Sequence, residues 1–307
     1  MTKILFSAQR NEGPFLLEWV AYHRVLGFDR VIVYSNDCTD GSDALLDALH
    51  DIGAVEHHRH AVPENESPQR NAANIAWNAG HFTHGDWVMW LDSDEFLLPS
   101  MGDRKLDDLI NDQSFDAMAV AWRYYGDSHN ARFPGRHISP AFTWAQGIDE
   151  AGWRQGKTLF RVNEHIAGLS IHRPLVSETM SHDTYRYINS SGHTAQDGFL
   201  SNDGPPFNRI KYQGLEPWKL AQVVHFIIRT PEMFARKQER GDGWFAATDN
   251  PVNRNHQFYN RRNMNECQVT DHLIHEQETV ALMQNWLSNF AVANACAQIK
   301  GFQWMPI

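Results

Sequence analysis

Three carboxylates follow directly after an apolar, uncharged segment of the chain. The segment spans residues 87–91, and the acids are Asp92, Asp94 and Glu95. An extended chain turns residues i and i+2 to one side, so we expect Asp92 and Asp94 to face the same way. Two carboxylates held so close repel each other unless a cation lies between them. Mg²⁺ and Mn²⁺ bind carboxylates together with substrate phosphates, so the spacing predicts a metal site. A solvated surface turn is the alternative interpretation.

Strand-like and helix-like segments alternate through the first hundred residues and would position this cluster. Apolar β-branched runs predict strands, and apolar residues at helical spacing between Pro or Ser starts and Gly ends predict helices. The predicted strands span 3–7, 30–34, 54–57 and 86–91, and the predicted helices span 14–27, 42–53 and 67–80. This rhythm predicts a mostly parallel, doubly wound α/β sheet. Open sheets of that kind bind ligands at the carboxyl ends of their strands, where the acid cluster falls.

The pattern changes after the acid cluster. Strands are expected at 115–125, 157–162 and 223–228, a helix from Pro231 to about Gly241, and a single C-terminal helix over 273–297. Long loops are expected at 126–140 and 181–217, and loops of that length in a compact domain are usually functional. The C-terminal helix has an apolar side and almost no Lys or Arg. This combination predicts a core contact or a homodimer contact rather than a membrane surface.

Composition excludes several classes of function. The 307 residues include 27 Lys and Arg against 37 Asp and Glu, which gives a formal net charge of −10. Nucleic-acid binding and attachment to an anionic membrane face depend on Lys and Arg, so neither is expected. The three cysteines, Cys38, Cys267 and Cys296, lie far apart, which favours a reducing cytoplasm over a disulfide scaffold. We expect no transmembrane segment, because no apolar run approaches the required length.

Five segments of the chain resemble, in the same order, motifs of known glycosyltransferases. The segments are QRNEGPFLLEW (9–19) with Tyr22, His23 and Gly27; IVYSNDCTDGS (32–42); WLDSDEF (90–96); WRYYG (122–126) with Lys157; and HFIIRT (225–230) with Phe234, Lys237, Arg240 and Gly241. Together they are similar to family 2-like glycosyltransferases, including relatives near family 92. The resemblance implies a GT-A fold, a Rossmann-like mixed sheet flanked by helices. It also implies transfer of a sugar from a nucleotide donor, expected to be UDP-linked, to a glycan or glycolipid acceptor.

The same resemblance implies an organisation and a location. A GT-A domain would span residues 1–241, with a nucleotide-binding half over about 1–100 and an acceptor half over about 101–241. Residues 242–307 would form a helical extension packed on that domain. We expect the protein in the cytoplasm, either free or bound peripherally at the inner face of the membrane.

The resemblance also implies roles for single residues. Asp94 would bind the metal directly, Asp92 would face the ribose or a metal-bound water, and His225 would complete the site from a distant strand. An imidazole ligand favours Mn²⁺ over Mg²⁺. Residues implied at the nucleoside end are Asn11, Glu12, Asn36 and Asp40; helix residues that could reach the donor are Gln69, Arg70 and Asn74; and cations for the diphosphate are Lys157, Lys237 and Arg240.

The catalytic base and the reaction class leave alternatives open. If the enzyme inverts the sugar, a carboxylate must take the proton of the acceptor hydroxyl. Asp127, directly after a predicted strand, is the candidate; the others are Asp149, Glu150, Glu178 and Asp183. A retaining enzyme needs no such base. A nucleotide-sugar hydrolase or nucleotidyltransferase, and a non-catalytic sugar-binding protein, are the alternative functions.

A second group of metal-ligating residue types occurs at His57, His58 and His60, around Arg59. On a strand these side chains alternate between the two faces of the sheet. The tract alone therefore does not predict a zinc site.

Overall fold

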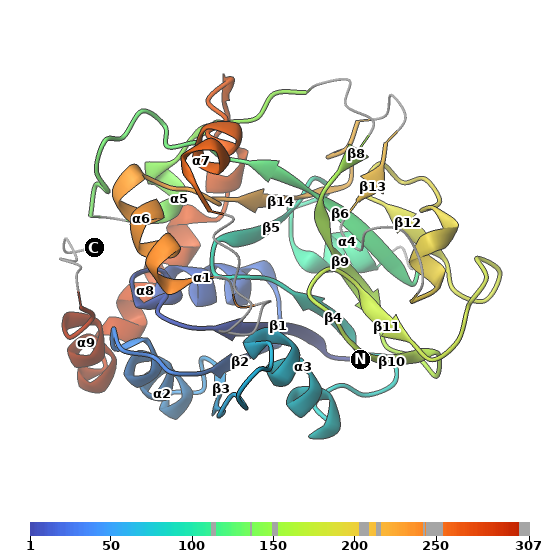
Figure 1. Cartoon of the computed structure of the whole chain (residues 1–307), viewed down its shortest axis with the longest axis horizontal. Helices are drawn as coiled ribbons and strands as arrows, with labels where there is room; N and C mark the ends of the chain where they lie inside the picture. Colours follow the sequence, from blue (N-terminus) through green and yellow to red (C-terminus); the bar gives the residue numbers. More distant parts are fainter. Residues whose placement is uncertain are drawn as a thin grey trace.

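The computed structural model describes residues 1–111, 115–135, 137–148, 153–202, 209–212, 216–241, 243 and 254–300. Its centre is a mixed nine-stranded sheet with helices on both faces (Figure 1). The hydrogen-bonded order is β3-β2-β1-β4-β9-β6-β14-β5, and β12 pairs with β6. The fold class predicted from the sequence, a GT-A-type Rossmann-like mixed sheet flanked by helices, is confirmed.

The strands of the main sheet come from the whole chain up to residue 225. They are β1 (Lys3–Gln9), β2 (Arg30–Ser35), β3 (Glu56–Arg59), β4 (Trp87–Trp90), β5 (Glu95–Pro99), β6 (Ala117–Tyr124), β9 (Gly156–Arg161), β12 (Tyr187–Asn189) and β14 (Ala221–His225). Three short pairs lie outside it: β7 (Trp144–Ala145) with β15 (Cys267–Gln268), β8 (Trp153–Arg154) with β13 (Ile210–Lys211), and β10 (Ile166–Leu169) with β11 (Pro174–Val176).

Helices connect and cover these strands. They are α1 (Gly13–Leu26), α2 (Ser42–Asp51), α3 (Pro68–Asn78), α4 (Leu106–Ile110), α5 (Ile138–Ala141), α6 (Pro231–Arg240), α7 (His256–Arg262), α8 (Glu276–Leu287) and α9 (Phe290–Ala297), with 3₁₀ turns η1 (Asp197–Leu200) and η2 (Asp271–Leu273). In the described part of the chain, none of the helices is both long and apolar enough to cross a membrane.

The helix boundaries follow the local signals that the sequence carries. Gly27 ends α1 in the left-handed conformation, at a φ of 115°. Ser67 caps α3 by accepting the Arg70 N–H, and Thr230 caps α6 by accepting the Met233 N–H. The caps at Ser67 and Thr230 fix the residues at which α3 and α6 begin.

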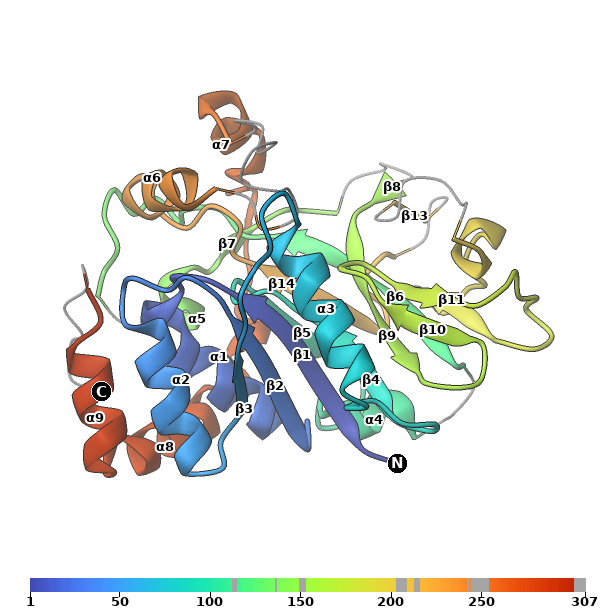
Figure 2. The same ribbon diagram turned by 60° about the horizontal axis from the view of Figure 1, so that its bottom comes forward.

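Two apolar cores cover the two faces of the sheet. One face packs against α1, α2, α4, α8 and α9, and the other against α3 and the β10–β11 hairpin. Figure 2 shows α3 on one side of the strands β1–β3 and α1 and α2 on the other. The strands β1, β2 and β4 carry apolar residues toward both cores, because both of their faces are covered.

The strands β5 and β14 bring distant parts of the sequence together. β14 pairs parallel with β6 and antiparallel with β5, in a register that places His225 opposite both Tyr124 and Glu95. A strand at 95–99 was not predicted, because the acid cluster reads locally as a loop. Because this strand exists, Glu95 begins a buried strand and lies directly beside His225, the last residue of β14.

Two expectations for the C-terminal half are wrong. The region 181–217 was expected to be loops, but it contains β12, η1 and β13. The single helix over 273–297 is two helices, α8 and α9. The Asn289 side chain accepts the N–H groups of Ala291 and Val292, so it starts a new helix at this point.

The C-terminal helices pack on the rest of the chain. α8 contacts α1 and α9 contacts α2. Two large apolar side chains of this region, Ile274 and Phe290, are exposed, the latter by 84%. The homodimer contact through this region stays a prediction, as do the domain boundaries.

Gly156 is predicted to be required for the pairing of β9 with β6. A Cβ atom at this position would lie 2.0 Å from the carbonyl oxygen of Val120, a backbone atom that cannot rotate away. Gly156→Ala should therefore lower the free energy of unfolding by about 3 kcal/mol in urea titrations. Gly168→Ala is the matched control, because its Cβ would meet Leu175 at an ordinary 3.4 Å. Equal stability losses in the two variants would contradict this account.

Candidate active site

The acid cluster lies where β4 ends, and three other segments complete it. β9 contributes Lys157, β14 contributes His225 and α6 contributes Lys237. Buried carboxylates require nearby cations or hydrogen-bond donors, because loss of water penalises their charged form. The cluster divides into two sets of contacts, one around Asp92 and Glu95 and one around Asp94.

Lys157 neutralises the first set. Its ammonium lies 3.1 Å from Asp92 Oδ2 and 3.2 Å from Glu95 Oε2, with the lysine only 1% exposed. Glu95 also accepts the Asp92 N–H at 2.8 Å, and Asp92 Oδ1 accepts from Gln69 at 3.3 Å. Burial raises the pKa of Glu95 to about 8, against the effect of Lys157. Burial alone would lower the pKa of Lys157, but Asp92 and Glu95 outweigh it and raise that pKa.

The second set joins Asp94, His225 and Lys237. His225 Nε2 lies 3.6 Å from Asp94 Oδ1, and the Lys237 ammonium contacts Asp94 Oδ2 and the Ile227 carbonyl. Burial would raise the pKa of Asp94, but Lys237 and His225 outweigh it and hold that pKa well below its ordinary value. Burial lowers the pKa of His225, so its imidazole is neutral at pH 7.

Two residues of the second set, Asp94 and His225, carry the donor atoms that a divalent ion would need. Asp94 and His225 are close enough to bind one ion, because His225 Nε2 lies 3.6 Å from Asp94 Oδ1. His225 Nδ1 faces Glu95 instead, at 4.0 Å. Two protein ligands completed by substrate phosphates suit Mg²⁺ or Mn²⁺. Asp92 does not converge with them, because it contacts Lys157 and Gln69 instead. The pair Asp94–His225 fits an ion once Lys237 leaves Asp94.

A further buried ion-pair cluster surrounds Glu12, directly after β1. Arg240 contacts one carboxylate oxygen of Glu12, and Arg229 lies 3.3 Å from the other. Burial would raise the pKa of Glu12, but Arg240 and Arg229 outweigh it and lower that pKa. The Arg229 guanidinium also stacks on Phe15 at 3.5 Å from the ring centre. Its Nε and one terminal nitrogen are buried without hydrogen-bond partners among the described residues.

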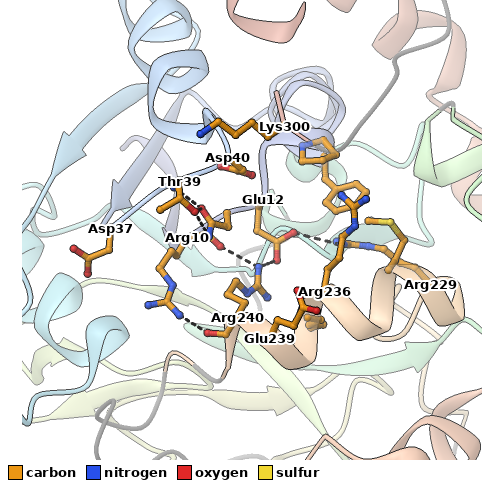
Figure 3. A pocket seen from close by; sticks show the side chains of 15 residues that line it. Arg10, Glu12, Asp37, Thr39, Asp40, Arg229, Arg236, Glu239, Arg240 and Lys300 are labelled. Atoms are coloured by element: carbon orange, nitrogen blue, oxygen red, sulfur yellow. Dashed lines mark hydrogen bonds and ion pairs between the residues drawn. The ribbon is translucent and has the colours of Figure 1, made fainter. Parts of the chain in front are cut away.

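A cavity of about 390 Å³ opens beside this cluster, between the ends of β1 and β2, α6 and residue 300. Figure 3 shows Arg229 and Arg240 pointing at Glu12 from one side, with Asp40 and Lys300 on the other. The walls carry more basic than acidic side chains: Arg10, Arg229, Arg236, Lys237, Arg240 and Lys300 against Glu12, Asp37, Asp40 and Glu239. This excess of positive charge suits an anionic ligand.

Three of the residues predicted at the nucleoside end, Asn11, Glu12 and Asp40, line the cavity. Asn11 and Asp40 also hold its walls together. The Asn11 side chain accepts the Thr39 N–H at 2.8 Å and so ties the end of β1 to the loop after β2. Asp40 accepts the Gly13 N–H at 3.1 Å and the Ser42 N–H at 2.8 Å, at the starts of α1 and α2.

The other predicted donor contacts are divided between the site and the surface. Asn36 does not line the cavity itself; it is buried and donates to Asp37, which does. Gln69 donates to Asp92 of the acid cluster, and its contact with the donor stays a prediction. Arg70 and Asn74 lie on the exposed side of α3.

Asp127, the predicted base, makes four hydrogen bonds within its own surroundings. Its Oδ1 accepts from the His129 N–H and Asn265, and its Oδ2 accepts from Tyr259 and Asn263, all at 2.8–2.9 Å. Burial would raise the pKa of Asp127, but these donors outweigh it and lower that pKa. A carboxylate with its lone pairs occupied is a weak proton acceptor. Asp127 therefore holds this loop together in the structure, and its role as the base stays a prediction that these contacts disfavour.

The alternative bases are not brought to the cavity either. Glu178 and Asp183 lie on exposed turns between β11 and β12, and neither lines the cavity. Asp149 and Glu150 lie outside the described residues.

The site residues that were not predicted include Glu95, Arg10, Arg229 and Lys300. Arg10 and Arg229 stand within the segments that resemble glycosyltransferase motifs, so their positions could have signalled a role. Lys300 comes from the region after α9, and its N–H donates to the Asp40 carbonyl at 2.8 Å. Nothing local in the sequence connects residue 300 to residue 40.

Comparison with known proteins decides the family. The sequence model of glycosyltransferase family 92 matches residues 8–186, which is more than half of the chain. The chain belongs to glycosyltransferase family 92. The motifs had suggested a wider group, the family 2-like glycosyltransferases with relatives near family 92. The match assigns the chain to family 92 within that suggestion.

Family 92 relatives occur among plant proteins. A family 92 protein of Ricinus communis is 27% identical over 218 residues, which cover 68% of this chain and 35% of the relative. One from Oryza sativa subsp. japonica is 28% identical over 139 residues, covering 44% and 23%. The chain thus spans about a third or less of the length of these curated relatives.

Solved structures resemble the chain only distantly. TarS of S. aureus matches with a TM-score of 0.37 and 12% identity, over 96% of this chain and 45% of TarS.

The Glu12–Arg240 pair is predicted to behave as a coupled unit. Arg240→Met leaves a buried carboxylate with one cation fewer, so it should lower the free energy of unfolding by about 3 kcal/mol. In the double variant with Glu12→Gln the loss should be smaller than the sum of the single losses by about 1 kcal/mol or more. Urea unfolding of the four proteins gives the coupling free energy. Additive losses would show that the pair is not formed in solution.

Proposed function

We propose that this family 92 chain transfers a glycosyl group from a nucleoside diphosphate sugar, with the donor bound in the cavity beside Glu12. The observation that carries the proposal is the basic cavity at the carboxyl ends of β1 and β2, next to the Asp94 cluster. Donors in α/β sheets bind at this edge. A donor diphosphate is the anion whose charge the cavity matches, and we infer that it is UDP-linked.

The cations have a direct part in this reaction. Cleavage of the sugar–phosphate bond leaves a nucleoside diphosphate, on which negative charge accumulates in the transition state. Preorganised cations that face this charge lower the barrier. Arg229 supports the assignment best, because two of its buried nitrogens have no partner among the described residues and so remain available as donors. Lys237 and Arg240 line the same cavity from α6.

Metal dependence is part of the proposal. Asp94 and His225 would hold Mn²⁺, or Mg²⁺, together with the donor phosphates. A bound ion of this kind would neutralise phosphate charge. Lys237 contacts Asp94 in the structure, so donor binding should move its ammonium from the carboxylate to the diphosphate. Asp92 serves the site through Lys157 and Gln69 rather than as a ligand.

The proposed acceptor separates glycosyl transfer from the alternative functions. We propose a hydroxyl of a glycan or glycolipid as acceptor. A nucleotide-sugar hydrolase would share the cavity but transfer the sugar to water. A nucleotidyltransferase would also share it but would form the nucleotide sugar from a nucleoside triphosphate. A sugar-binding protein would have no need for lysines buried against the acid cluster.

Asp94→Ala is predicted to remove the metal dependence of nucleotide binding. Calorimetry with UDP should show tighter binding to the wild-type chain with Mn²⁺ than without it, and no effect of Mn²⁺ on the variant. Asp103→Ala, on an exposed turn, is the control and should bind as the wild type does. A Mn²⁺ effect that survives in Asp94→Ala would overturn the metal assignment but leave the cavity assignment standing.

Arg229→Met is predicted to weaken UDP binding about tenfold to 100-fold, because hydrogen bonds from a cation to phosphate are lost. Arg229→Lys should recover only part of the affinity, since an ammonium lacks the planar fork of the guanidinium. Lys219→Met removes an exposed cation outside the cavity and serves as the control. Equal affinities for wild type and Arg229→Met would place the nucleotide elsewhere.

Turnover distinguishes the three functions. Nucleotide sugars are offered with and without glycan acceptors, and release of nucleoside diphosphate and of glycosylated acceptor is followed by mass spectrometry. Transfer that needs an acceptor and is lost in Asp94→Ala supports the proposal. Release of free sugar alone indicates a hydrolase. No turnover of any donor, with tight binding of sugars, indicates a binding protein.

A further inference from the structure

A second group of potential metal ligands lies away from the cavity, on the edge strand β3 and the segment after α3. It consists of Glu56, His58 and His81, which offer ligand atoms within 4.8 Å of one another. Over the ranges that the structure describes, no other set of three His, Cys, Asp or Glu residues meets this condition. None of the three lines the cavity described above.

Strand geometry selects these residues from the histidine-rich tract. Glu56 and His58 are two apart on β3 and share one face, whereas His57 faces α2, where Asp47 lies 2.6 Å from its Nδ1. The β2–β3 register places Tyr34 opposite His58, and their rings stack with centroids 4.8 Å apart. His81 follows α3 and brings its ring to 4.9 Å from that of His58.

The distances suit two imidazoles on one ion. With Zn–N bonds of about 2.0–2.1 Å and near-tetrahedral angles, two bound imidazole rings have centroids roughly 5 Å apart. The observed 4.9 Å agrees. His58 Nε2 is also buried, with no hydrogen-bond partner in the described part of the chain. A buried polar atom without a partner needs an explanation, and an ion beside it is one.

The neighbours of the three residues can act as a supporting shell. Arg30 binds Glu56 through two hydrogen bonds of 2.5 and 2.6 Å, one to each oxygen. Each carboxylate oxygen has a second lone pair, so the carboxylate can accept from Arg30 and bind an ion at once. The Tyr34 hydroxyl lies 3.0 Å from His81 Nε2 and fixes that ring. Hydrogen-bonded partners of this kind usually orient metal ligands.

We propose that Glu56, His58 and His81 bind a transition-metal ion, Zn²⁺ by the chemistry of the ligands, with water completing its coordination. Two imidazoles and one carboxylate suit Zn²⁺ better than Mg²⁺ or Ca²⁺, which prefer oxygen ligands alone. The ion would join the edge strand β3 to the segment that follows α3, and so stabilise this side of the sheet. The proposal does not depend on sugar transfer.

The protonation states agree with this assignment. Burial lowers the pKa of both His58 and His81. Their rings are therefore neutral at pH 7 and have lone pairs for a metal.

Titration of the full chain with Zn²⁺ and Co²⁺ at pH 7.5 tests the proposal. We expect one ion bound outside the active site, visible absorption from bound Co²⁺, and a higher melting temperature with Zn²⁺. His58→Ala and His81→Ala should each weaken binding about 100-fold and abolish the melting shift. His84→Ala, an exposed neighbour, is the matched control and should change neither. Asp94→Ala, measured in parallel, should retain the site, because it removes a ligand only from the active-site pair.

If His58→Ala or His81→Ala fails to fold, a third variant still tests the proposal. Glu56→Gln keeps the shape of the side chain and should weaken binding while circular dichroism stays unchanged. The proposal is overturned if the wild-type chain binds no Zn²⁺ or Co²⁺, or if binding persists undiminished in folded His58→Ala and His81→Ala. Binding that disappears only in Asp94→Ala would equally overturn it, since the ion would then belong to the active site.

Discussion

Neutralisation of buried carboxylates is the constraint on which the site depends. Glu12 and Asp94 lie inside the protein at the carboxyl ends of β1 and β4, where water cannot screen them. Each has a cation in contact: Arg229 and Arg240 at Glu12, and Lys237 at Asp94. Lys157, from β9, contacts Asp92 together with Glu95, whose pKa burial raises to about 8. Removal of one partner would leave a buried charge, which costs several kcal/mol. The arrangement therefore fixes α6 and β9 against the ends of the first strands.

The same charges give the site its proposed chemistry. Lys237 and the arginines stabilise the fold through internal carboxylates, yet they also line the cavity. An anionic donor would share these cations with the protein, so its binding should rearrange the contacts rather than fill a passive space. Lys237 is the residue most affected, because it contacts the carboxylate of the proposed metal ligand. A preformed set of cations is what stabilises charge that develops during bond cleavage.

The sequence predicted the elements with strong local signals and missed what depends on distant pairing. The caps Ser67 and Thr230 and the end of α1 at Gly27 were read correctly, because each makes contacts within one turn. The resemblance, not local pattern, placed His225 near the acids, since only the β5–β14 register connects them. The position of Asp127 after a strand does not reveal the four donors around it. Lys300 had no signal at all.

A crystal structure of the chain with UDP and Mn²⁺, with anomalous diffraction to locate the manganese, tests the central claim most directly. The account predicts an anomalous peak bound by Asp94, His225 and diphosphate oxygens. It also predicts that Arg229 contacts the diphosphate and that the Lys237 ammonium has left Asp94. Density for UDP outside the cavity, or a manganese peak that neither Asp94 nor His225 contacts, would contradict it.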